Sequence, residues 1–235
     1  MKERQVNAML IIKNCNLINM AGIYKEKKDL VVKDGKVLDI CDDACQKYGQ
    51  GNVIIDACGN YVTPGIVEPH CSLGVKEEVF RFEGNDADET TDPIVPQVRA
   101  MDAINPRDEG FKMALAGGVT TAVTCPGNAN PIGGTCAAIK TTGNTVEEMV
   151  MVPEIAIKMC LTDGVKNTYG GKRSPMTRLG TAALIREALM KAKRYHDQWT
   201  ASQKDPANKP PKFDMKLPDA RIRRNARKIH RQARP

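Results

Sequence analysis

Aromatic residues are scarce in this sequence: they make up 4% of its 235 residues, with one Trp, four Phe and five Tyr. The interior must therefore be built mainly from Val, Ile, Leu, Met and Ala. No apolar run approaches the roughly 20 residues that a membrane-spanning helix needs. The N-terminal segment MKERQVNAML lacks the apolar stretch and cleavage site of a secretory signal. These absences predict a globular, cytoplasmic protein without a membrane partner.

Disulfide and zinc-finger patterns are also missing, although the chain contains eight cysteines. The cysteines are scattered, and none of them form a CxxC pair. The chain is also long enough, and rich enough in aliphatic residues, to fold without cross-links. We therefore expect reduced cysteines that pack as small apolar side chains.

The net charge of +7 is concentrated at the C-terminus. Residues 218–235 contain six Arg, one Lys and one Asp, so the rest of the chain carries only about +1. The segment has no aromatic residue on which bases could stack, and it has no apolar face to bury. We interpret it as a disordered basic tail and do not expect nucleic acid as a partner. A nucleic-acid-associated or interaction role through this tail is the alternative function.

The N-terminal part, residues 1–62, is predicted to be a small β domain. LIIKNCNLIN alternates and is β-branched, and KDLVVKDGKVLDI contains two strand-like runs around Asp34-Gly35, a strong hairpin signal. A further strand follows in NVIIDACGNYV. This pattern predicts a small β-sandwich or open barrel.

From Thr63 onward, short apolar strands alternate with helical segments, which predicts βα units and a parallel sheet. GIVEPH, VTTAVTC, TCAAIKT and PEIAIKMCL are strand candidates. Helices are expected in NPRDEGFKMALAGG, with Asn105 as cap, in TVEEMVM, and in a long segment that begins with Ser174 as cap. Residues 63–197 are thus predicted to be an α/β domain, and residues 198–235 a polar linker and tail.

One stretch, DACGNYVTPGIVEPHC, resembles the entry segment of the metal-dependent amidohydrolase superfamily. Later segments, from TDPIVPQ through YGGKRSPMTRLG, are similar to its imidazolonepropionase-like subgroup. The resemblance implies a small N-terminal β-sandwich that leads into a TIM-type (β/α)8 barrel. It also implies hydrolysis of a non-peptide, cyclic-amide C–N bond by a water that a divalent metal, typically zinc, activates.

In that family the first barrel strand ends in His-x-His, and residues two apart share a strand face. Here His70 occupies the first position and Ser72 replaces the second histidine. Some members use a carboxylated lysine after the fourth strand, and Lys158 stands in a similar setting. The resemblance thus makes His70 and Lys158 the metal-ligand candidates, while the catalytic residue stays unidentified.

Length predicts that the barrel is incomplete, because a full one needs about 250 residues and 171 follow Pro64. The C-terminal part of the barrel is expected to be missing, with a reading-frame change near Leu217-Pro218 as one explanation. A non-catalytic member of the family is therefore an alternative to an active hydrolase.

Two polar loops are predicted to face a small-molecule substrate, because they follow the first two barrel strands, where substrate loops lie. Self-association into a homo-oligomer stays open. The loop candidates are Glu83, Asp92, Asn128 and Asn130.

Overall fold

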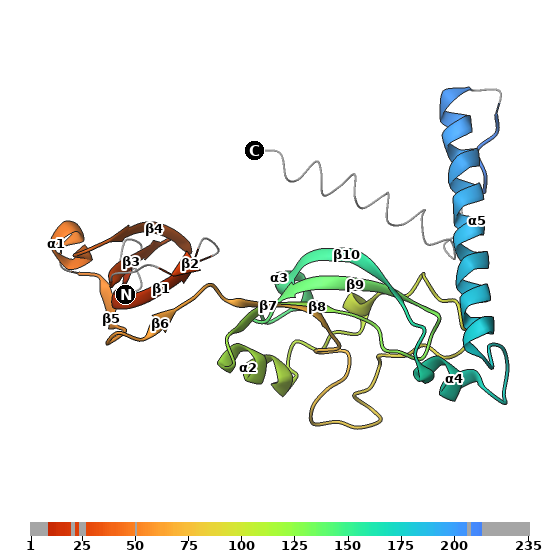
Figure 1. Ribbon diagram of the computed structural model, residues 1–235, viewed down its shortest axis with the longest axis horizontal. Coiled ribbons are helices and arrows are strands. Elements are labelled where there is room, and N and C mark those ends of the chain that lie inside the picture. Colours follow the sequence, from red (N-terminus) through yellow and green to blue (C-terminus); the bar gives the residue numbers. More distant parts are fainter. Residues whose placement is uncertain (1–8, 20–21, 24–26, 50, 206–207, 213–235) are drawn as a thin grey trace. The chain divides into compact units, whose positions relative to one another are not determined.

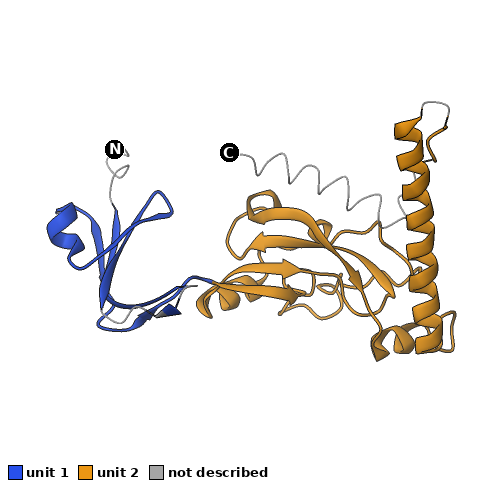
Figure 2. Ribbon diagram, turned by 45° about the horizontal axis from the view of Figure 1, so that its top comes forward, with its two compact units in different colours: residues 1–65 blue, residues 66–235 orange. Residues whose placement is uncertain are grey.

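The computed structural model describes residues 9–19, 22–23, 27–49, 51–205 and 208–212. The predicted basic tail, residues 218–235, lies outside them. The chain is a mixed α/β protein that divides into two compact units, Met1–Gly65 and Ile66–Pro235 (Figure 2). Within the described part, no helix is both long and apolar enough to cross a membrane.

The first unit is organised around its longest strand, β1 (Leu10–Asn19). This strand pairs antiparallel with β2 (Gly22–Ile23) and β3 (Lys28–Lys33), and parallel with β5 (Val53–Asp56) and β6 (Tyr61–Val62). β3 forms a hairpin with β4 (Lys36–Cys41). Both turn residues, Asp34 and Gly35, have positive φ angles, of 50° and 73°, as a tight two-residue hairpin requires. The predicted hairpin is confirmed.

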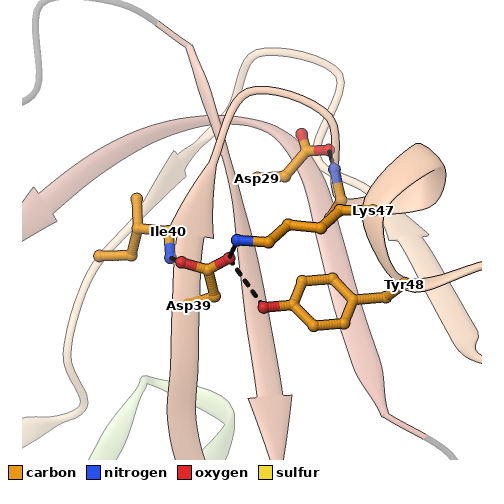
Figure 3. A network of polar contacts seen from close by, with 6 residues as sticks. Asp29, Asp39, Ile40, Lys47 and Tyr48 are labelled. Carbon is orange, nitrogen blue, oxygen red and sulfur yellow. Dashed lines mark hydrogen bonds and ion pairs between the residues drawn. The ribbon is translucent and has the colours of Figure 1, made fainter.

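The short helix α1 (Ala44–Tyr48) packs on this sheet, and two carboxylates fix its position. Asp29 accepts a hydrogen bond from the Ala44 backbone N–H (2.9 Å). Asp39 on β4 accepts from Lys47 Nζ (2.7 Å) and from the Tyr48 hydroxyl (2.8 Å), as Figure 3 shows. These two contacts lower the pKa of Asp39 to about 2, with the Lys47 hydrogen bond as the largest cause.

The second unit contains a four-stranded sheet of order β10-β9-β8-β7 (Figure 1). Its strands are β7 (Ile66–Cys71), β8 (Val119–Thr124), β9 (Ile132–Lys140) and β10 (Val150–Met159). β7 and β8 are parallel and are connected through α2 (Glu109–Ala116).

The other two strand pairs of this sheet, β8 with β9 and β9 with β10, are antiparallel, so the prediction of an all-parallel sheet is wrong. Parallel neighbours need a crossover of a dozen or more residues. The connection from β8 to β9, residues 125–131, is shorter and holds no helix. The barrel therefore stays a prediction.

Two helices have other N-cap residues than predicted, because the side-chain oxygen of a nearby residue accepts the hydrogen bond from the first turn. α2 is capped by Asp108, which accepts from Gly110 N–H (3.2 Å). Asn105 instead accepts from Arg107 N–H in the preceding turn. The long helix α5 (Arg178–Lys204) is capped by Thr177 rather than by Ser174. It continues into the segment that the sequence assigns to the linker.

The described residues of the second unit also form three short helical segments. They are η1 (Ala100–Asp102), α3 (Val146–Met149) and α4 (Asp163–Tyr169). α3 agrees with the expected helix in TVEEMVM, although β10 begins directly after it.

The main core of this unit lies between α2 and one face of the sheet. Ala122, Ala137 and Ile139 project from β8 and β9 onto Phe111 of α2. Because strand side chains alternate, the residues between them face the other way. The candidate site is built on that opposite face.

Candidate functional site

His70 and Lys158, the two predicted metal ligands, meet in the structure. His70 is next to the last residue of β7, and Lys158 is next to the last residue of β10. Lys158 Nζ lies 2.5 Å from His70 Nε2. These are the edge strands of the sheet, about 14 Å apart if three strand spacings lie flat. Strand alternation places both side chains on the same face of the sheet, where they meet.

Two cysteines lie on the inner strands between this pair. Cys125 directly follows β8, and Cys136 is in β9; each is 2% exposed. The hydrogen bond between the two thiols lowers the pKa of Cys125 and, together with burial, raises the pKa of Cys136. The site face therefore gathers an imidazole, two thiols and an amine, from the ends of β7, β8 and β10 and from the middle of β9.

The residues after His70 do not complete a histidine pair. The Ser72 hydroxyl donates to the Cys125 backbone carbonyl (3.3 Å) and so is committed to the backbone. Cys71 packs against the α2 core, as strand alternation requires, and burial raises the pKa of its thiol. Among the residues that the structure describes, no group of three or more His, Cys, Asp or Glu side chains could hold a metal ion.

A surface hollow borders the end of β7. It is lined by Cys71, Ser72 and Leu73 and by residues of the loop that follows, including Lys76, Phe80 and Arg81. Phe80 is 58% exposed. An apolar ring beside charged side chains is a suitable lining for a small polar ligand.

Asn130 holds the two predicted substrate loops together. It is buried, and its Nδ2 donates to the backbone carbonyls of Glu89 (2.6 Å) and Asp92 (2.9 Å) and to the Tyr169 hydroxyl (2.9 Å). The same hydroxyl donates to the Asp92 carbonyl (3.1 Å). We call Asn130, Tyr169 and the Asp92 carbonyl the loop lock. The amide hydrogens of Asn130 are thus directed into the protein.

Two further contacts join the segment before η1 to the segment between β8 and β9 and to the start of β9. Asp88 accepts a hydrogen bond from the Ala129 N–H (2.8 Å). At Gly134, where φ is +105°, an added Cβ would lie 2.5 Å from the Val98 carbonyl oxygen. The glycine there is required both by the left-handed backbone and by the neighbouring chain.

The other loop candidates lie in different surroundings. Glu83 is exposed. The Asp92 carboxylate accepts from the Ile94 N–H (3.1 Å). Asn128 is exposed, and its Oδ1 lies 3.8 Å from Cys160 Sγ as an acceptor. Their roles toward a substrate stay predictions.

Sequence reasoning missed the cysteine pair and Tyr169. The signal for the pair was the loop between two strands, PGNANPIGG, which joins Cys125 to the strand that carries Cys136. Only an antiparallel hairpin places the two cysteines opposite each other, and the sequence was interpreted as parallel. Tyr169 stands out only as one of the few aromatic residues.

No protein-family model matches the chain. It is 31% identical over 187 residues to the amidohydrolase tasK of Hapsidospora irregularis, covering 73% of this chain and 19% of that protein. It is 33% identical over 125 residues to a dihydroorotase of Clostridioides difficile, covering 53% of this chain and 23% of that protein.

An L-hydantoinase of Paenarthrobacter aurescens is 38% identical over 77 residues, which cover 32% of this chain and 16% of that protein. Among solved structures, an amidohydrolase from Thermotoga maritima superposes with a TM-score of 0.80 at 32% identity. That match covers 91% of this chain and 55% of the other. The matched part of this chain covers less than a quarter of the length of the tasK amidohydrolase, the dihydroorotase and the hydantoinase.

Proposed function

The chain belongs to the metal-dependent amidohydrolase superfamily, and from that membership we propose that its site hydrolyses the C–N bond of a cyclic amide. Hydantoinase and dihydroorotase, the names of two relatives, both describe enzymes of ring-shaped amides. The metal ligands of the proposed site are His70 and Lys158. The observation that carries the proposal is the 2.5 Å approach of their side chains from opposite edges of the sheet.

The two nitrogens lie close enough to act as two ligands of one tetrahedral zinc ion. Nitrogen ligands lie about 2.0–2.1 Å from zinc, so two of them on a tetrahedral ion are about 3.3 Å apart. Both side chains end in freely rotating groups near solvent, and a separation of about 1 Å more needs no backbone change. A divalent metal bound there would lower the pKa of its water to about 7 and polarise a substrate carbonyl.

Protonation of Lys158 decides whether it can act as a ligand. As an ammonium it has no lone pair, and it can only donate a hydrogen bond to His70 Nε2. A neutral amine offers nitrogen, and a carboxylated lysine offers oxygen. The proposal therefore requires Lys158 to lose its positive charge when metal binds, so binding releases a proton or consumes carbon dioxide.

Other residues around the site would position the substrate. The hollow beside Ser72 and Phe80 offers an apolar surface with Lys76 and Arg81 at its border. These cations suit the oxygens of a ring amide or of an attached carboxylate. The loop lock keeps the two polar loops adjacent, one carrying Glu89 and Asp92 and the other Asn130.

The test is a hydrolysis assay with hydantoin and dihydropyrimidine rings as probes. The full chain is incubated with zinc and bicarbonate, and ring opening is followed by the loss of ultraviolet absorbance. We expect turnover that His70→Asn and Lys158→Gln each lower by at least about a hundredfold. Lys140→Gln is the matched control, because Lys140 is an exposed lysine at the end of β9.

Turnover that is unchanged in both site variants would refute this assignment of the ligands. Absence of turnover in the wild-type chain, under conditions where zinc binds, would support the alternative of a non-catalytic family member.

A further inference from the structure

Cys125 and Cys136 form a pair across two neighbouring strands. The printed register of β8 and β9 ends with Thr124 opposite Ala137. Continuing this register by one residue in each direction places Cys125 opposite Cys136. The backbone of Cys125 still follows the sheet, because its N–H donates to the Cys71 carbonyl (2.8 Å).

The two thiols also lie on the same face. Ala122, Ala137 and Ile139 are directed toward the α2 core. Alternation from Ala137 to Cys136 therefore points Cys136 to the opposite face, and the register carries Cys125 there as well. Directly opposed residues of an antiparallel pair have Cα atoms about 4.5–5.5 Å apart, which lies inside the disulfide range of about 4.4–6.8 Å.

We infer that Cys125 and Cys136 are a reversible redox site, in which hydrogen peroxide joins them as an intramolecular disulfide. This inference is independent of the proposed hydrolase function. It depends only on the strand register and on the shared face of the two side chains.

The local contacts assign different roles to the two sulfurs. The hydrogen bond with Cys136 lowers the pKa of Cys125. The same hydrogen bond and burial raise the pKa of Cys136. The thiolate is the reactive form of cysteine, so Cys125 is the sulfur that attacks peroxide.

The reaction balances with peroxide as the oxidant. The Cys125 sulfur attacks one peroxide oxygen, the O–O bond breaks, and the products are a Cys125 sulfenic acid and one water. The Cys136 sulfur then attacks the sulfenic sulfur, the S–O bond breaks, and a second water leaves. Two thiols lose two electrons and two hydrogens, and one peroxide is reduced to two waters.

Burial selects small oxidants. Each cysteine is 2% exposed, so a bulky reagent reaches them only when the strand ends open. Exposed Cys58 is the natural comparison within the same chain. The disulfide would close the loop that carries Asn128 and Asn130, and would link the end of β8 to the middle of β9.

The test exposes the native full-length chain to hydrogen peroxide, blocks the remaining thiols and maps the peptides without reduction. We expect one linked peptide pair, Cys125 to Cys136, which has lost two hydrogens and which a dithiol reductant restores. Cys71→Ser is the matched control and should retain the link, because its thiol lies on the other face. A link from Cys125 to Cys71, or two free thiols after exposed Cys58 has been oxidised, would overturn the inference.

A second variant pair tests the order of the two steps and does not depend on disulfide yield. In Cys136→Ser the sulfenic acid should persist at Cys125 and be trapped by dimedone. In Cys125→Ser, trapping at Cys136 should be at least about tenfold lower. Equal trapping in the two variants would contradict the assigned roles. Circular dichroism of each variant establishes that it retains the native fold.

Discussion

Removing one hydroxyl from the loop lock should loosen both loops of the candidate site. Tyr169→Phe keeps the buried ring, which packs with Cys160 and Val165, and removes only Oη. That oxygen donates to the Asp92 carbonyl (3.1 Å) and accepts from Asn130 Nδ2 (2.9 Å). The variant therefore tests two hydrogen bonds without creating a large cavity.

The expected loss of stability in Tyr169→Phe depends on which hydrogen bonds of the loop lock remain. After the substitution the Asp92 carbonyl still accepts from Asn130, and the Asn130 amide still has two carbonyl partners. No buried group is left without a partner, so each lost bond contributes about 0.5–1.5 kcal/mol. We expect the free energy of unfolding to fall by about 1–2 kcal/mol. Asn130→Ala removes three hydrogen bonds and leaves the Glu89 carbonyl without its partner, so it should lower the free energy of unfolding by about twice as much.

The pH dependence gives a second, independent measure. Burial is the main cause that raises the pKa of Tyr169 to about 12, whereas an unfolded phenol ionises near about 10. A raised pKa means that the folded chain favours the neutral phenol, and the unfolded chain ionises first as the pH rises. The contribution of Tyr169 is thus complete below about pH 10 and is lost between about 10 and 12.

The assay is urea unfolding of wild type and Tyr169→Phe at several pH values, with hydrogen exchange of the Ala129 and Ile94 amides as the local readout. Tyr195→Phe is the control, because no hydrogen bond of its hydroxyl occurs in the described part of the chain. The difference in the free energy of unfolding between wild type and Tyr169→Phe should shrink as the pH rises from about 10 to about 12. A stability difference below about 0.3 kcal/mol, with unchanged exchange at both amides, would refute the loop lock as an energetic link.

Substitutions at three further places test local features of the fold. Gly134→Ala should destabilise the second unit by more than about 2 kcal/mol, because of backbone contact as well as positive φ. Gly171→Ala, with positive φ but open space, should cost only about 1 kcal/mol, and equal costs would contradict the contact. For the start of α5, Thr177→Ala should lower the free energy of unfolding by about 1 kcal/mol and Ser174→Ala by much less. Thermal unfolding measures both, and a larger loss in Ser174→Ala would make Ser174 the cap. Asp39, whose pKa is lowered to about 2, should stabilise the first unit above about pH 4 and lose this effect as the pH falls through about 2. Asp39→Asn should therefore flatten the acid unfolding curve, and an unchanged curve would exclude the contact.

Local signals in the sequence were sufficient for the features that depend on near neighbours. The hairpin at Asp34-Gly35 follows from turn chemistry, and the strand that ends at His70 follows from its apolar run between Gly65 and a polar loop. The candidate ligand Lys158 came from the family resemblance, and the structure brings it to His70.

Features that depend on pairing between strands could not be obtained in this way. An apolar strand has the same composition whether its neighbour is parallel or antiparallel, so the direction of β9 was mispredicted. The opposition of Cys125 and Cys136 depends on that direction. The buried position of Asn130 could not be predicted either. The local sequence around a polar loop residue is the same whether its side chain faces solvent or holds two loops together.

Metal binding tests the central claim most directly. The full chain is dialysed against zinc with bicarbonate present, and the bound metal is quantified by mass spectrometry and by cobalt absorption after exchange. We predict about one metal per chain, retained in Lys140→Gln, and an affinity at least about tenfold weaker in both His70→Asn and Lys158→Gln. Equal binding by the wild-type chain and both site variants would show that the meeting of these two side chains does not form a metal site.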